Sequence, residues 1–378
     1  DAAAVKGRGY NYTSRRGALN LNQLLNWTRE FGEHNFNVLL GHETKNDKYK
    51  YLEGHMTNFA DPTNPDFSNA TQYQGLTSYS AEYALEGYFA KLDYDYADKY
   101  YLTGSIRRDG SSRFHKDNRW GSFWAIGGSW RAKEEAFLKD VEWLDNLKVK
   151  ASFGTQGNDN VGYYHNYSDL YVVERVDGDA AFTKELRGNK DLTWEKTTQY
   201  NIGVDFSIFK DRLTITADAY YSRTTDLLLS VKTIQSTGFD NRFTNLGLTS
   251  NKGVELTIVS HNFDRRKFGW ITEFTISHNS QRVEDIGHED YVSLVDSSGY
   301  MMYGYKAGYP LNALWGFQYE GVFHNEEEVR RNRVLHTYAS QTGFSDNDDL
   351  KHVGRAKYAD VDGDGSLSQA DLVYLGQA

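Results

Sequence analysis

Cysteine is absent from this chain of 378 residues, and proline occurs only 3 times. Without cysteine the chain can form no disulfide, offers no thiolate nucleophile and cannot build a cysteine-ligated zinc or iron–sulfur centre. No run of about 18 apolar residues occurs either, which excludes a transmembrane helix. A membrane barrel is not excluded, because its short alternating strands look hydrophilic on average.

Motifs for catalysis and phosphate binding are also missing. The sequence has no G-x-x-x-x-G-K-[ST], G-x-G-x-x-G, G-x-S-x-G or H-E-x-x-H pattern, and its 11 His are scattered without ligand spacing. We therefore expect no enzyme. The formal net charge of -10 argues against a protein that binds phosphate backbones, so nucleic acid is not an expected partner.

Aromatic residues and glycine are what the sequence has in quantity, with 28 Tyr, 20 Phe, 8 Trp and 34 Gly. A disordered chain would have few aromatics, so disorder is excluded. Tyr, Phe, Trp and Gly are typical of strands and turns, which argues against a helical bundle. No Pro-rich or Ser-rich linker and no block of like charge divides the chain, so we expect a single unit.

Alternation of polar and apolar residues is the dominant pattern. It is almost complete in residues 200–208 (YNIGVDFSI), which predicts a two-faced strand. Residues 213–221 continue it, and the four residues between the two runs predict a hairpin. Residues 88–96 and 102–106 predict a second hairpin with an equally short turn.

The other connections are long and polar, at about 109–119, 157–191 and 230–249. Short turns at one end and long loops at the other are typical of outer-membrane barrels. Short amphipathic helices are predicted at 133–145 and, more weakly, at 326–335. Further strands are predicted at residues 19–28, 35–43, 121–131, 147–155, 253–260, 270–279 and 314–321.

Strand length separates the two all-β alternatives. Residues 197–209 and 213–229 are longer than the roughly 9–11 residues that a tilted strand needs to cross a bilayer, whereas strands of soluble sandwiches are usually shorter. Pattern alone favours a membrane barrel and leaves a soluble sandwich, propeller or solenoid open. Several aromatic residues lie near the predicted strand ends. In a membrane barrel they would form girdles at the two interfaces, and in a soluble fold they would fill the core. They are Trp120, Phe123, Trp124, Trp130 and Trp143.

Six segments resemble one family, the SusC/RagA-type TonB-dependent nutrient transporters of the Bacteroidetes outer membrane. They occur in the family's order, cover most of residues 82–378, and match more loosely over the first 80 residues. They are YFAKLDYDYADKYYLTGSIRRDGSSRF (88–114), LKVKASFGTQGNDNVGYY (147–164), NKDLTWEKTTQYNIGVDFSIFKDRLTITADAYYSRTTDLLL (189–229), TNLGLTSNKGVELTI (244–258), GYPLNALWGFQYEGVF (308–323) and YADVDGDGSLSQADLVYLGQA (358–378).

The resemblance implies an all-β fold, an antiparallel transmembrane β-barrel of the large plugged class with 22 strands. Residues 1–378 would be part of that barrel, with the plug domain and the final strands outside the chain. Such transporters import oligosaccharides or peptides with a SusD-like surface lipoprotein, while the TonB complex pulls on the plug. The expected location is the bacterial outer membrane, in contact with its lipid. Three loop tyrosines, Tyr163, Tyr164 and Tyr167, would stack on sugars, meet the lipoprotein or simply pack the loop.

One stretch carries the pattern of a metal site. Residues 360–371 (DVDGDGSLSQAD) follow the twelve-residue EF-hand loop, with oxygen ligands at alternate positions and Gly365 at the sharp turn. The expected ion is a structural Ca²⁺. Asp at the last position has a shorter reach than Glu, and the flanks do not read as paired helices; a solvated Asp-Gly turn is the alternative. The predicted ligands are Asp360, Asp362, Asp364, Ser366 (through its carbonyl) and Asp371.

Two functions remain open on the residues themselves. The first is a segment of an outer-membrane, TonB-dependent importer for oligosaccharides or peptides. The second is a secreted, soluble all-β glycan-binding module or glycosidase with a structural calcium. Nothing in the sequence separates a sugar substrate from a peptide.

Overall fold

The computed structural model places most of the chain in long strands. It describes residues 5–61, 63–162, 166–176, 179–265, 268–287, 292–293, 301–331, 335–336, 353–364, 366–367 and 369–377. The chain separates into two compact units, which are Asp1–Leu246 with Lys252–Asn279, and Gly247–Asn251 with Ser280–Ala378. No helix among the described residues is long and apolar enough to cross a membrane.

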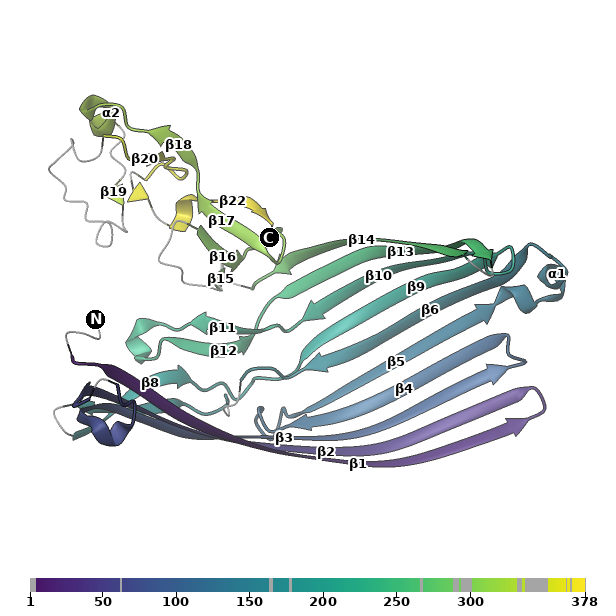
Figure 1. The fold of residues 1–378 in the computed structure, drawn as a ribbon, viewed down its shortest axis with the longest axis horizontal. Coiled ribbons are helices and arrows are strands. Elements are labelled where there is room, and N and C mark those ends of the chain that lie inside the picture. Colours follow the sequence, from purple (N-terminus) through teal and green to yellow (C-terminus); the bar gives the residue numbers. More distant parts are fainter. Residues whose placement is uncertain are drawn as a thin grey trace. The chain divides into compact units, whose positions relative to one another are not determined.

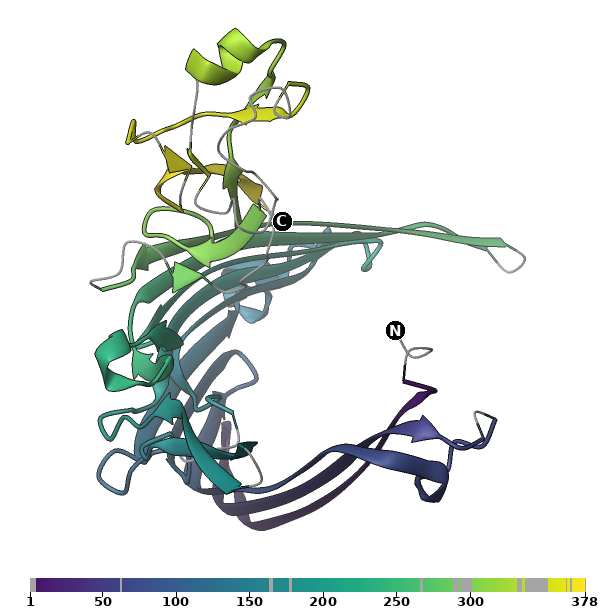
Figure 2. The same cartoon turned by 90° about the vertical axis from the view of Figure 1, so that its left-hand side faces the viewer.

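An open sheet of ten strands dominates the structure, with β1 and β14 at its edges (Figure 1). Neighbouring strands from β1 to β10 pair antiparallel, and Figure 2 shows this part of the sheet curving along its width. The predicted strands all fall within it, except the last. In spatial order the ten are β1 (Arg8–Phe31), β2 (His34–Phe59), β3 (Ala70–Tyr96), β4 (Tyr100–Ser111), β5 (Trp120–Arg131), β6 (Leu144–Asn158), β9 (Glu195–Ile208), β10 (Leu213–Thr225), β13 (Leu248–Arg265) and β14 (Phe268–Asp285).

Tight turns join the strands at one end of the sheet. Both predicted hairpins are confirmed: β9 pairs with β10 and β3 with β4. Their turns use left-handed backbone, with φ of 58° at Phe209 and 60° at Lys210, and 54° at Ala97 and 53° at Asp98. Successive positive φ angles match the right-handed twist of the flanking strands, which is why turns this short can close a hairpin.

The helix predicted at 133–145 is much shorter than expected. It consists of the 3₁₀ turn η2 (Ala132–Glu134) and the four residues of α1 (Ala136–Lys139). Lys133 ends it by donating hydrogen bonds from Nζ to the carbonyls of Leu138, Lys139 and Val141, at 3.1, 3.1 and 2.7 Å. Leu144 then enters β6, because pairing with β9 satisfies its backbone.

The opposite end carries the long connections, as expected, but two of them are not simple loops. The segments predicted as loops at 157–191 and 230–249 contain β7 (Leu170–Val176), β8 (Asp179–Arg187), β11 (Leu228–Lys232) and β12 (Asn241–Asn245), with η3 (Gln235–Thr237). These strands form a separate sheet in the order β11-β12-β8-β7. The strand predicted through residue 229 ends at Thr225, because Asp226 adopts a left-handed φ of 58°. In the β2–β3 connection, the described residues form one short element, η1 (Phe67–Asn69).

The buried core of the first unit lies at this long-loop end. Phe114, Phe123, Val161, Leu192 and Trp194 pack together there, with Phe114 and Leu192 fully buried. Trp194 donates from Nε1 to the carbonyl of Arg119 at 2.8 Å. Phe123 therefore fills a core, whereas the sequence suggested a girdle position for it as one alternative.

The second unit consists of short strands around its own core of Ala313, Trp315, Phe317, Leu367 and Leu372. The strand predicted at 314–321 is divided in two, β17 and β18. Of the helix predicted at 326–335, α2 forms the first part and residues 335–336 belong to β19, while residues 332–334 lie outside the described residues. The elements of this unit are β15 (Val292–Ser293), β16 (Met301–Tyr305), β17 (Ala313–Phe317), β18 (Tyr319–Val322), α2 (Glu326–Arg331), β19 (Leu335–His336), β20 (Ala356–Tyr358), β21 (Ser366–Leu367), η5 (Gln369–Asp371) and β22 (Leu372–Gln377).

A close approach at Gly41 in β2 yields a stability prediction. A Cβ added at Gly41 would lie 2.1 Å from the ring of Phe89 on β3, whereas one at Gly104 in β4 would meet nothing within 4 Å. We expect Gly41→Ala to lower the free energy of unfolding by about 1–3 kcal/mol, because the ring must move. Denaturant unfolding of the full-length barrel in detergent measures this. Gly104→Ala is the matched control, and equal stability of the two variants would contradict the prediction.

Candidate functional site

Strand register sorts the side chains of the main sheet onto two chemically different faces. In the β9–β10 pair, Tyr200 lies opposite Tyr221 and Ile202 lies opposite Ala219, all on one face of the sheet. Asp205 lies opposite Thr216 on the other face. The alternation predicted from the sequence is therefore confirmed. We call the side with Tyr200 and Ile202 the apolar face, and the side with Asp205 the polar face. Ile202 is 58% exposed, so the apolar face is not covered by other parts of the first unit.

Aromatic side chains form two rows on the apolar face, one near each end of the strands. The rows are about 27 Å apart along β3, from Tyr88 to Tyr96, at about 3.4 Å per residue. A strand tilt of about 40° reduces this to a height of about 21 Å, close to the apolar band of a membrane barrel. Ring contacts in the rows include Phe36–Tyr94 (4.9 Å), His34–Tyr96 (4.8 Å) and Tyr96–Tyr100 (6.3 Å) at the short-turn end, and His42–Tyr88 (4.7 Å), Tyr88–Trp120 (6.3 Å), Trp124–Phe153 (5.1 Å) and Phe153–Tyr200 (4.5 Å) at the long-loop end.

Ion pairs between strands lie on the polar face of the sheet. Lys150 of β6 reaches Asp205 of β9 at 3.2 Å and Asp218 of β10 at 3.0 Å. Arg107 of β4 contacts Glu43 of β2 at 2.9 Å and Asp109 at 2.7 Å. Each cation thus neutralises two carboxylates that the register brings close together. Sequence reasoning missed these residues, although charges at alternate strand positions were a visible signal.

A hollow of about 310 Å³ lies among these polar side chains, towards the short-turn end. Its walls include Asp93 and Asp95 of β3, Tyr101 and Thr103 of β4, and Lys150 of β6. The residues around it offer both charges and hydroxyls and no nucleophile–base pair, which suits contact with a polar chain or solute rather than bond-breaking chemistry.

The acidic loop of the second unit brings three of the predicted ligands together. Carboxylate oxygens of Asp360, Asp362 and Asp364 all lie within 4.8 Å of one another. The amide of Asp364 donates to Asp362 and lowers its pKa, but partial desolvation and the carboxylates of Asp364, Asp371 and Asp360 outweigh this and raise the pKa of Asp362 above its usual value. Crowded carboxylates of this kind favour either protonation or a cation.

Of the two remaining predicted ligands, Asp371 binds the loop backbone, and the side chain of Ser366 lies outside the described residues. Asp371 is fully buried, and its Oδ1 accepts hydrogen bonds from the amides of Val361 and Asp362, at 2.7 and 3.4 Å. It therefore holds the loop backbone with this oxygen. Ser366 belongs to β21, and its side chain lies outside the described part, as does Gly365. Of the three loop tyrosines, Tyr163 and Tyr164 also lie outside it, and Tyr167 packs edge-on against His115 at 5.7 Å.

Comparison with known proteins decides the family. The family model described as TonB dependent receptor-like, beta-barrel matches residues 2–362. The chain belongs to this family. Among curated relatives, this receptor barrel is 34% identical over 308 residues to TonB-dependent receptor P39 of Formosa agariphila, covering 80% of this chain and 29% of the relative. It is 30% identical over 316 residues to TonB-dependent receptor SusC of Bacteroides thetaiotaomicron, covering 79% of this chain and 31% of that one.

Solved structures agree on the fold. The RagAB peptide importer in its closed-closed state superposes with a TM-score of 0.75 at 22% identity, covering 97% of this chain and 38% of the other. The receptor barrel described here thus spans about a third of the length of its relatives.

Family membership assigns the two faces of the receptor barrel. The protein is an all-β outer-membrane protein, so the apolar face with its aromatic rows meets lipid and the polar face lines the barrel interior. This confirms the expected fold class, location and non-enzymatic nature of the chain, and it decides against the secreted soluble module. The short turns mark the periplasmic end and the long loops the extracellular end.

The Lys150 cluster predicts a measurable coupling inside the receptor barrel. Lys150→Met leaves Asp205 and Asp218 without their shared cation, and we expect a loss of about 1 kcal/mol that Asp218→Asn partly restores. A double-mutant cycle by denaturant unfolding of the full-length protein measures it. Lys91→Met is the matched control, because the ion pair that Lys91 makes among the described residues is with Asp93 of its own strand, at 2.9 Å. An additive cycle at Lys150 would contradict the coupling.

Proposed function

We propose that the chain forms part of the wall of a TonB-dependent importer that carries nutrients across the outer membrane. The observation that supports this most strongly is the pairing of a lipid-facing apolar surface with an interior surface of charged and hydroxyl side chains, in a chain of the receptor family. An interior of this kind solvates a polar solute during passage. The energy would come from the TonB complex acting on a plug domain.

The proposed substrates are oligosaccharides or peptides, delivered with a SusD-like surface lipoprotein. The similarity to SusC supports this partnership, and the RagAB peptide transporter has the same fold. The sheet of β7, β8, β11 and β12 at the extracellular end is a candidate contact surface for such a partner. Tyr167, which lies in the same connection, is a candidate contact for partner or sugar.

Growth of a deletion strain tests the import function. A strain lacking the gene is grown on single oligosaccharides and on single peptides as sole nutrients. We expect growth to fail on one substrate and to return when the full-length gene is supplied. Supplying the gene in a strain without a working TonB complex should not restore growth. Unchanged growth of the deletion strain on every substrate would contradict the proposal.

We also propose that residues 360–371 bind a structural Ca²⁺. The proposed ligands are the carboxylates of Asp360, Asp362 and Asp364, with Asp371 and the Ser366 carbonyl completing the set. Support comes from the close approach of the first three carboxylates and from the raised pKa of Asp362. Ca²⁺ accepts 6–8 oxygen ligands in a flexible geometry, so a loop of this type suits it better than Mg²⁺.

Calorimetry on the full-length protein measures this site. We expect one Ca²⁺ to bind, and Asp362→Ala to abolish the uptake; Asp66→Ala, in the exposed β2–β3 connection, is the control. Protons compete for the carboxylates, so affinity should fall as the pH is lowered towards the raised pKa of Asp362, earlier than for an ordinary aspartate. Ca²⁺ uptake that survives in Asp362→Ala would contradict the assignment.

A further inference from the structure

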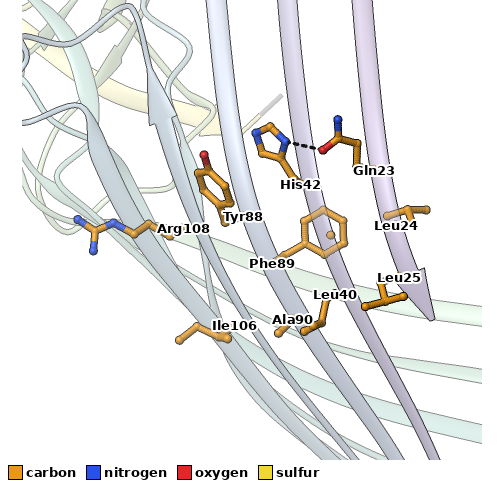
Figure 3. Close-up of a pocket in the computed structure, with 11 residues that line it drawn as sticks. Gln23, Leu24, Leu25, Leu40, His42, Tyr88, Phe89, Ala90, Ile106 and Arg108 are labelled. Atoms are coloured by element: carbon orange, nitrogen blue, oxygen red, sulfur yellow. Dashed lines mark hydrogen bonds between the residues drawn. The ribbon is translucent and has the colours of Figure 1, made fainter. Parts of the chain in front are cut away.

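A groove of about 600 Å³ crosses the apolar face over β1 to β4 (Figure 3). It exists because Ala90 of β3 is small and lies directly between the larger Leu40 of β2 and Ile106 of β4. Phe89 lies against Gly41 from the polar face and closes the floor with its ring. The register places the groove on the lipid-facing side, since His42, Tyr88 and Arg108 share that side.

The part of the groove nearer the membrane centre is lined by aliphatic side chains. Leu25 is 64% exposed, Leu40 47% and Ile106 58%, and Figure 3 shows them around Ala90. In the bilayer these side chains face hydrocarbon. Their shape and chemistry match an acyl chain lying along the strands.

The extracellular end of the groove is polar. His42 contacts Gln23 and Glu86 through its two ring nitrogens, each at 3.4 Å, and the hydroxyl of Tyr88 donates to Glu86 at 2.6 Å. His42 and Tyr88 also stack at 4.7 Å. Amide, imidazole and carboxylate groups in a row can exchange hydrogen bonds with hydroxyl and amide groups of a sugar. Plain hydrocarbon would offer no hydrogen bond to these groups beyond the ones that they make with each other.

Arg108 supplies a positive charge beside this polar row. It lies directly opposite Tyr88, and its guanidinium stands over the ring of Trp120 at 5.6 Å. In the part of the chain that the structure describes, no carboxylate forms an ion pair with Arg108, and the nearby Glu86 is held by Tyr88 and His42. A cation on a membrane surface is stabilised where an anionic headgroup can reach it.

We propose that this groove binds one phosphorylated glycolipid of the outer leaflet. The acyl chain lies over Leu40, Ala90 and Ile106, the sugar contacts Gln23, His42 and Glu86, and a phosphate pairs with Arg108. The long loops mark the extracellular end, so the polar row and Arg108 sit at the headgroups of the outer leaflet. A plain phospholipid would leave the sugar contacts unused, and a second copy of the chain would bring no phosphate to Arg108.

Native mass spectrometry of the full-length protein in detergent tests the proposal, with diphosphoryl lipid A and its dephosphorylated form as probes. We expect Arg108→Ala to lower retention of the diphosphoryl form about tenfold, as loss of a charge-assisted contact predicts, and to affect the dephosphorylated form by less than about twofold. Arg29→Ala is the matched control, because Arg29 also lies on the lipid-facing side over an aromatic ring, Phe31 at 5.3 Å, but at the periplasmic end.

A second variant tests the acyl-chain part without touching charge. Ala90→Phe fills the groove and should lower retention of both lipid forms. The proposal is overturned if Arg108→Ala retains the diphosphoryl form as the parent protein does, or if Arg29→Ala loses it equally. It is also overturned if Ala90→Phe changes the oligomeric state and leaves lipid retention unchanged, since the occupant would then be a second copy.

Discussion

Continuous antiparallel pairing between neighbouring strands is the constraint from which both faces of the receptor barrel follow. Because side chains alternate along a strand with a period of two, a slip of β10 by one residue against β9 would bring Asp218 into lipid and Ala219 into the interior. The bilayer makes such a slip very unfavourable, since a charge in hydrocarbon is costly. The register therefore decides which side chains face lipid, and the lipid in turn makes any other register unfavourable.

The interior wall shows the same dependence at the level of charge. Lys150, Asp205 and Asp218 come from three strands and meet only because β6, β9 and β10 are adjacent and in register. The groove on the outer side depends on register as well, since pairing places the small Ala90 between Leu40 and Ile106. The interior ion pairs and the exterior groove therefore both depend on the same pairing of strands.

Local sequence predicted the elements whose structure depends on near neighbours. The alternation in residues 200–208 and the short turn that follows specified the β9–β10 hairpin, and Asp360, Asp362 and Asp364 converge as their spacing predicted. Predictions were wrong where distant contacts decide. Residues 133–145 have an amphipathic pattern, but the helix ends at Lys139, where Lys133 binds its last carbonyls, and Leu144 pairs with β9. The strands β7 and β8 were predicted as loop; they pair with each other, and β8 also pairs with β12, which comes much later in the chain.

By itself, the sequence determined that the protein is an all-β chain with two-faced strands, short turns at one end and long connections at the other, because these features arise from the side-chain period and from local turn chemistry. Only the tertiary structure decided which charged residues meet across strands, which aromatics fill the core rather than the girdle, as Phe123 does, and where the lipid-facing surface is hollow. These properties depend on which strands are neighbours and in what register, and a single strand carries no record of its partner.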